Sequence, residues 1–139
     1  MAEDTERAKS QARAQIESIV EIMSALKKAQ DEGEAEYDGE MYDEDYIRER
    51  ISEDPLSVQV RSDWHTPGDE GESVEFEILL CTGGPAVRII GELRENYNEP
   101  ESATVQYQDW FTPWVDYSET TEEEDKAILR YCQHFYYGE

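Results

Sequence analysis

The side chains best suited to catalysis or metal binding are few in this 139-residue chain. It contains two histidines, His65 and His134, and two cysteines, Cys81 and Cys132. Cys132 and His134 are two residues apart, which on a helix points them to different sides, so they form a poor metal pair. No CxxC or HExxH ligand spacing is present. We therefore predict no metal site and no cofactor.

Other patterns associated with catalysis or phosphate binding are missing as well. Gly83-Gly84 is followed by a predicted strand, whereas a phosphate-binding loop requires Lys-Ser/Thr and a helix. There is no GxSxG nucleophile motif, and the acidic stretch after residue 31 does not match the ligand pattern of a calcium loop. With 35 acidic residues, any carboxylate pair chosen for acid–base catalysis would be arbitrary. We predict that the protein is not an enzyme and has no catalytic residues.

The informative chemical property of the chain is its negative charge. Lys and Arg total 12 against 35 Asp and Glu, which gives a formal net charge of −23. Duplex DNA carries about one charge per 1.7 Å of axis, so the same charge corresponds to about 40 Å of duplex, similar to the width of a compact chain of this length. Direct binding to nucleic acid or to an anionic membrane is therefore disfavoured. A basic DNA- or RNA-binding protein or complex is the natural partner.

The acidic residues are concentrated in the later chain, because residues 1–31 have a net charge of only −1. They gather in residues 31–54 and 119–125. On a helix, acids one turn apart are separated by about 5.4 Å, similar to phosphates along a DNA strand. We expect both stretches to present carboxylates to a groove lined by Lys and Arg, with tyrosines as interface anchors. The candidate partner-binding residues are Glu34, Glu36, Asp38, Glu40, Asp43, Glu44, Asp45, Glu49, Glu122, Glu123, Glu124, Tyr37 and Tyr42, with Tyr46 nearby.

The element expected to hold these acids in place is a hairpin over residues 74–93. Apolar residues alternate from Val74 to Leu80 and again from Val87 to Leu93. The loop between them, residues 82–85, contains two glycines and a proline. Alternation on both sides of a short glycine-containing loop predicts an antiparallel β-hairpin at the centre of a sheet.

Helical periodicity predicts three helices around this hairpin. Residues 3–30 carry an apolar stripe that includes Ile16 and Leu26, and the helix could pack on the sheet or pair with a second copy as a homodimer. A short helix should start at Asp43, with Tyr46, Ile47 and Ile51 on one side, and end near Asp54 because Pro55 follows. A last helix should start with a capping box, either Thr120 with Glu123 or Thr121 with Glu124. Its buried stripe is predicted to be Ile128, Tyr131, Cys132 and Phe135.

Two further strands are expected. Leu56, Val58 and Val60 alternate before the hairpin, and Ala103, Val105 and Tyr107 alternate after it. Residues 31–45, 62–73 and 95–102 are predicted to be loops or turns, and residues 109–114 a loop at the edge of the core. The chain should thus form one α+β domain over residues 1–139, with a small antiparallel sheet of about four strands, an amino-terminal and a carboxy-terminal helix, and a flexible acidic segment at 31–45.

No basic-then-apolar leader follows Met1 and no apolar run approaches membrane-spanning length, so we expect a cytoplasmic protein with reduced cysteines. The segments ILLCTGGPAVRI, YQDWFTPW and YCQHFYYG together resemble a family of small acidic accessory proteins of bacterial phages and plasmids. The resemblance covers about residues 78–138 and excludes the acidic amino-terminal half. It implies an anti-restriction or anti-CRISPR protein acting in the host cytoplasm, and it transfers no functional residue.

The leading hypothesis is an inhibitor that imitates DNA and blocks the nucleic-acid-binding surface of a host defence complex, either CRISPR-Cas or a restriction system. Adaptation to high salt is an alternative, because halophile proteins are also rich in acids and poor in lysine, and this chain has four lysines. An acidic chaperone or adaptor for a basic DNA-binding protein is a third, with the same electrostatics and a different partner. The clustering of the acids favours recognition over general solvation.

Overall fold

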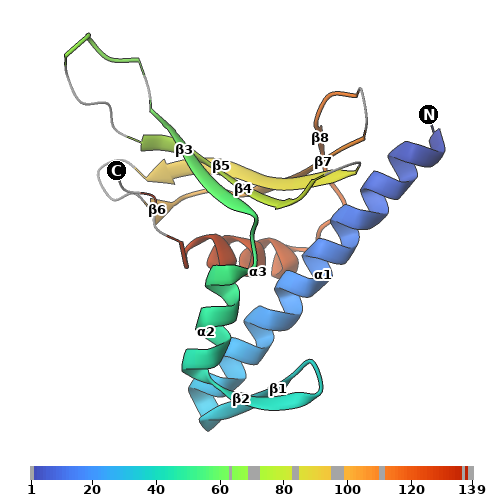
Figure 1. The fold of residues 1–139 in the computed structure, drawn as a ribbon, viewed down its shortest axis with the longest axis vertical. Helices are drawn as coiled ribbons and strands as arrows, with labels where there is room; N and C mark the ends of the chain where they lie inside the picture. The colour runs from blue at the N-terminus through green and yellow to red at the C-terminus, as the bar shows by residue number, and fades with distance from the viewer. Residues whose placement is uncertain are drawn as a thin grey trace.

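The computed structural model describes residues 2–62, 64–68, 73–82, 85–94, 99–109, 112–135 and 137. In this part of the chain the elements are α1 (Ala2–Glu32), β1 (Glu34–Tyr37), β2 (Glu40–Asp43), α2 (Glu44–Glu53), β3 (Ser57–Ser62), β4 (Ser73–Cys81), β5 (Ala86–Arg94), β6 (Glu99–Pro100), β7 (Thr104–Gln108), β8 (Val115–Asp116) and α3 (Glu122–Cys132). The α+β class is confirmed, although more strands form than the four predicted, in two separate sheets. Figure 1 shows the larger sheet across one end of the molecule and α1 running from beside it to the opposite end.

The larger sheet is antiparallel, with the strand order β3-β4-β5-β7-β8 and β6 paired with β5. Its centre is the predicted hairpin of β4 and β5, in which Ile78 lies opposite Ile89 and both are fully buried. Gly91 lies opposite Phe76, and a side chain there would collide with the Phe76 ring and the Ser102 carbonyl oxygen. The glycine thus allows the chain after β6 to pass close to the sheet. The two glycines of the predicted hairpin loop lie outside the described residues.

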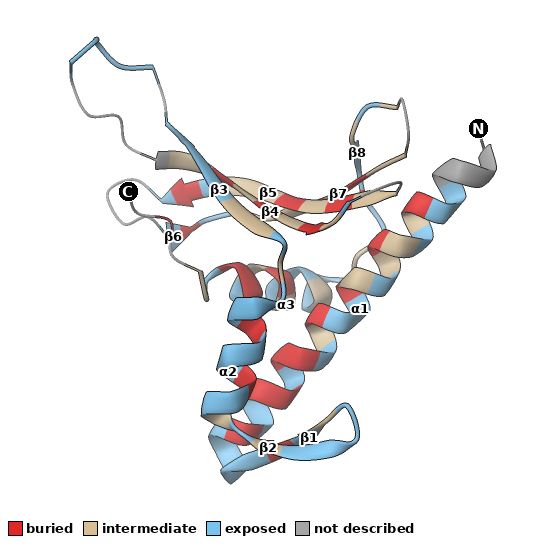
Figure 2. Cartoon of the chain, in the orientation of Figure 1, coloured by how far each residue is buried: buried red, intermediate tan, exposed pale blue. Residues whose placement is uncertain are grey.

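Helix α1 buries its apolar stripe within the same chain. Residues from Ala8 to Ala29 are buried at three- and four-residue spacing, as predicted for residues such as Ile16 and Leu26. The helix contacts β5, β7 and α3, and beyond them α2 and β1. Figure 2 shows the buried residues along the side of α1 that faces these elements. Packing on other elements of one chain therefore accounts for the stripe, and pairing with a second copy through α1 stays a prediction. No described helix is long and apolar enough to cross a membrane.

The two shorter helices begin where their capping residues predict. The Asp43 side chain accepts a hydrogen bond from the Tyr46 backbone N–H at 2.9 Å, and α2 ends before Pro55. Ile47 and Ile51 are buried, whereas Tyr46, predicted on the same side of the helix, is 39% exposed. In α3 the capping box is formed by Thr121 and Glu124. Its residues Ile128, Tyr131 and Cys132 are buried as predicted, but the helix ends at Cys132, so Phe135, predicted in the same stripe, lies beyond it and is partly buried.

The acidic segment predicted to be a loop forms the β1–β2 hairpin instead. Asp38 and Gly39 have φ values of 54° and 86°, and a two-residue turn with both central residues in the left-handed region is a type I′ turn. Gly33, with φ of 91°, ends α1 and donates its N–H to the Ala29 carbonyl. The two chain reversals are made by residues that tolerate positive φ, so the hairpin folds back onto α1.

The strand predicted after Pro55 is confirmed as β3. Leu56, just before the strand, and Val60 are 60% and 41% exposed, whereas Val58 between them is half-buried. The strand after β6 agrees with its prediction, since Val105 and Tyr107 are buried. Parts of the predicted connections at 62–73, 95–102 and 109–114 lie outside the described residues. Cys81 and Cys132 are free thiols.

Candidate protein-interaction surface

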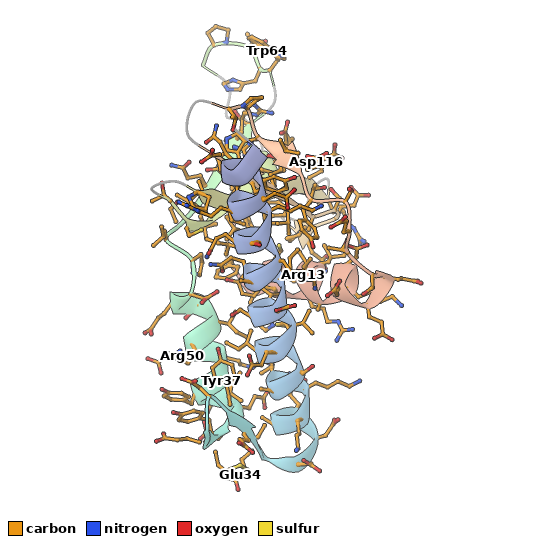
Figure 3. All side chains as sticks on the ribbon, turned by 90° about the vertical axis from the view of Figure 1, so that its right-hand side faces the viewer. Arg13, Glu34, Tyr37, Arg50, Trp64 and Asp116 are labelled. Carbon is orange, nitrogen blue, oxygen red and sulfur yellow. The ribbon has the colours of Figure 1, made fainter. Side chains whose placement is uncertain are left out.

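The end of the molecule farthest from the larger sheet carries the densest negative charge. We call it the acidic lobe and define it as residues 31–54, which comprise the last residues of α1, the β1–β2 hairpin, α2 and its cap. These residues include twelve acids and two arginines, a net charge of −10. Figure 3 shows Glu34 at the tip of this lobe, and Tyr37 and Arg50 together on its side. The acids are therefore gathered at one end rather than spread evenly.

The hairpin places acids on its outer face. Glu34 lies opposite Asp43, and Glu36 opposite Met41, and all four are exposed, while Ala35 between the two glutamates is fully buried. Like charges directly opposite each other on a sheet are destabilising. The lobe therefore holds Glu34 and Asp43 together at a cost that other contacts of the hairpin must offset.

Helix α2 continues this surface with an exposed row of carboxylates. Asp45, Glu49 and Glu53 are four residues apart, so each lies about 6 Å along the helix axis from the next. In the described part of the chain, no basic nitrogen lies within the 4.0 Å ion-pair distance of these three side chains. Glu44 differs, because Arg48 Nη2 lies 2.8 Å from its Oε1. The pKa of Glu44 is accordingly lowered, first by Arg48 and then by Gln30.

Aromatic side chains lie among these acids. The Tyr42 and Tyr46 rings stack with centroids 4.1 Å apart. Met41, on the opposite face of the hairpin from Tyr42, is 54% exposed. The Tyr42 hydroxyl donates to Glu40 Oε2 at 2.8 Å, and this hydrogen bond is the main reason that the pKa of Tyr42 is raised to about 12. A neutral, partly exposed aromatic pair surrounded by carboxylates can contact both the aliphatic stems and the charged ends of lysine and arginine.

Tyr37 contributes in a different way. Its hydroxyl lies beside Arg50 and is the main reason that the pKa of this guanidinium is raised, with a smaller effect of Asp38. Tyr37 is half-buried against the core, whereas Asp38 and Glu40 on either side of the Gly39 turn are exposed. Arg50 is thus engaged on the side of the lobe, and the tip remains acidic.

The predicted acids of α3 do not join the lobe. The start of α3 lies against Arg13, which is 19 residues, or about 28 Å along the helix, from the end of α1. Glu124 accepts from both Arg13 and the Thr121 N–H, and its pKa is lowered chiefly by Arg13. Glu122 is 3.7 Å from Lys126 Nζ. Of the three predicted acids here, Glu123 alone has no basic nitrogen at ion-pair distance among the described residues. Glu124 therefore has a structural role, and we leave it out of the proposed surface.

The sequence prediction missed two residues of the lobe. Glu53 completes the row of α2, and its spacing from Asp45 and Glu49 was visible in the sequence. Met41 lies on the exposed face because Asp38-Gly39 closes a tight hairpin, and this dipeptide is itself a strong hairpin signal. Composition obscured that signal, because strands rich in glutamate are uncommon.

The remaining reactive side chains are not set up for covalent chemistry. Burial raises the pKa of both thiols, Cys81 and Cys132, so they stay protonated near neutral pH and are weak nucleophiles. Burial and the nearby Arg48 lower the pKa of His134. The described residues contain no group of three or more His, Cys, Asp or Glu placed to hold a metal ion.

Comparison with protein-family models, with curated proteins and with solved structures finds no match to this chain. The geometry and charge of the acidic lobe are therefore the basis for inferring its function.

Proposed function

We propose that the protein binds the positively charged nucleic-acid-binding surface of another protein through its acidic lobe and thereby blocks DNA binding. The observation that carries the proposal is the row of Asp45, Glu49 and Glu53, which is exposed and has no described cation at ion-pair distance. A groove that binds DNA holds Lys and Arg to contact successive phosphates, and the row offers successive carboxylates. The target class is a host defence complex, of the CRISPR-Cas or restriction type, as the sequence resemblance implies.

Two features of the lobe support recognition over general solvation. Like charges at i and i+4 on a helix are unfavourable, and α2 repeats this arrangement along its exposed side. Residues that lower stability without a compensating local contact are typical of binding sites. In addition, twelve of the 35 acids lie within residues 31–54, whereas salt adaptation requires no such concentration. The stacked Tyr42 and Tyr46 supply the aromatic contact area that protein interfaces favour.

A competition experiment tests the proposal. A fluorescent DNA duplex is bound to each candidate defence complex at low salt, and the release of DNA is followed as the protein is added. The proposal requires release with at least one complex, and weaker release as salt rises, because the contact is electrostatic. If DNA binding by every candidate complex is unchanged at low salt, the proposal fails.

A matched pair of variants locates the contact. The triple variant Asp45→Asn/Glu49→Gln/Glu53→Gln removes the row, and the control Glu6→Gln/Glu92→Gln/Glu101→Gln removes the same charge from exposed positions elsewhere. With exposed ion pairs each contributing about 0.2–1 kcal/mol, the first variant should compete about tenfold less well and the control nearly as well as the wild type. Equal losses in both would mean that total charge matters and the lobe does not. Unfolding of the wild type in dilute buffer but not in molar salt would favour salt adaptation.

A further inference from the structure

The second surface of interest is the free edge of the larger sheet at β3. This strand is the last in the order β3-β4-β5-β7-β8, and β4 is the only strand with which it pairs among the described residues. The Glu92 N–H and C=O groups bond to the chain around Ser102, so even-numbered residues of β5 face β6 and β7, and odd-numbered ones face β4. Following this alternation through the pairing of β5 with β4 and of β4 with β3, the odd-numbered residues of β3 direct their backbone groups toward β4. The N–H and C=O groups of Val58 and Val60 therefore face outward. Figure 1 shows no described element along this side of β3.

The edge is also apolar and poorly protected. Leu56 and Val60, 60% and 41% exposed, lie on the same face of the strand as the half-buried Val58. Monomeric proteins usually protect an edge by making it very short or by placing Lys or Pro on it. The opposite edge, β8, has only two residues, whereas β3 has six and contains neither Lys nor Pro. Its only irregularity is a register shift between Arg61 and Ser62, at the end of the strand.

The charge of the strand indicates what covers it. Residues 55–62 contain no acid and one arginine in a chain of net charge −23. A basic partner would find no carboxylate on this strand to pair with. A second copy brings an equally acid-free strand to the contact, so that no carboxylates of the two strands oppose each other. The remaining charges repel from farther away, where salt screens them.

We propose that β3 pairs antiparallel with β3 of a second copy, which joins the two larger sheets into one. The register that pairs most of the strand places Gln59 opposite Gln59, and the outward N–H and C=O groups of Val58 and Val60 then bond between the two copies. Val58 then lies opposite Val60 of the second copy, and the exposed apolar atoms of both are covered. Such an interface is isologous and closes as a two-fold dimer.

The dimer should be reversible and should respond to salt in the opposite direction to the proposed inhibition. A six-residue strand pair is smaller than a standard interface of about 800 Å² per partner, so we expect concentration-dependent association. Two chains of charge −23 repel each other, and added salt weakens this repulsion. Dimerisation therefore strengthens with salt, whereas binding to a basic groove weakens.

Sedimentation or light scattering over a hundredfold range of protein concentration, in low salt and in about 0.5 M salt, tests the inference. The mass should rise from the 16.1 kDa of one chain toward twice that value, and more readily in the higher salt. A mass that stays at one chain in both conditions, or a dimer that weakens with salt, would overturn the inference.

Two pairs of variants assign any dimer to β3. Val60→Pro removes an outward N–H without removing a β3–β4 hydrogen bond, and Val60→Ala keeps that N–H. The proline variant should weaken dimerisation about tenfold or more and the alanine variant little. Val60→Lys adds a charge beside Val58 of the second copy and should weaken the dimer, whereas the control Val60→Thr adds no charge. This second pair tests whether β3 forms the interface if the proline variant does not fold. Dimers unchanged by both Pro and Lys would place the interface elsewhere. The monomeric variants should still compete with DNA, since the lobe is untouched.

Discussion

Replacing Glu49 with Gln should stabilise the protein in low salt. Glu49 is exposed in the middle of α2 and lies one turn from both Asp45 and Glu53. Gln and Glu have similar helix propensities and nearly the same shape, so the substitution changes little besides the charge. If the carboxylate row is held against its own repulsion, removing the central charge relieves the repulsion on both sides.

The expected gain follows from the spacing of the row. A like-charge pair at i and i+4 costs about 0.2–0.5 kcal/mol, so relief of two pairs amounts to about 0.4–1 kcal/mol. For a chain of this length this corresponds to a rise of about 1–4 °C in Tm. The carboxylates are about 6 Å apart along the axis, and the screening length in 1 M salt is about 3 Å, so most of the gain should vanish there.

Thermal and urea unfolding, followed by circular dichroism in low salt and in 1 M salt, measure this effect. Glu44→Gln is the matched control, because it is the same substitution on the same helix but removes the partner of Arg48. It should lower stability in low salt, so the two variants should shift Tm in opposite directions. If Glu49→Gln leaves Tm unchanged or lowers it in low salt, or if the gain in Tm persists in 1 M salt, the proposed repulsion between the carboxylates of α2 is refuted.

Two further predictions concern contacts outside the acidic lobe that stabilise the packing of α1, α3 and the larger sheet. Glu124→Gln keeps the capping box, which accepts Gln, but loses the ion pair with Arg13, at a cost of about 1 kcal/mol at neutral pH. The pKa of Glu124 in the folded protein lies below its usual 4.5, so the stability from this ion pair is present above pH 4.5 and is lost as the pH falls through the folded pKa. The urea midpoints of the wild type and the variant should therefore converge in acid. A difference between the midpoints that stays constant with pH would contradict this dependence. Gly91→Ala should destabilise by about 1–3 kcal/mol, because the new methyl group meets the Phe76 ring and the Ser102 carbonyl, and an unchanged urea midpoint would show that the chain does not pack closely there.

Much of the fold was predictable because its signals are local. The β4–β5 hairpin shows alternation on both sides of its loop, and α2 and α3 begin at Asp43 and Thr121, whose side chains cap the next turn. The β1–β2 hairpin was missed although Asp38-Gly39 is a strong turn signal, because glutamates at strand positions disguise the alternation. The exposure of Val60 was missed for another reason, since alternation marks one face of a strand but not whether that face is covered.

The sequence by itself determined the net charge and indicated three helices and a basic partner, since these inferences depend on composition and on neighbours within a few residues. Only the tertiary structure decided which carboxylates are available to a partner. Glu124 and Glu49 were both predicted to contact the partner, yet Glu124 meets Arg13 from 111 positions away, whereas Glu49 meets no described cation. Long-range packing of α1 against α3 creates that difference, because an ion pair depends on distance in space rather than along the chain.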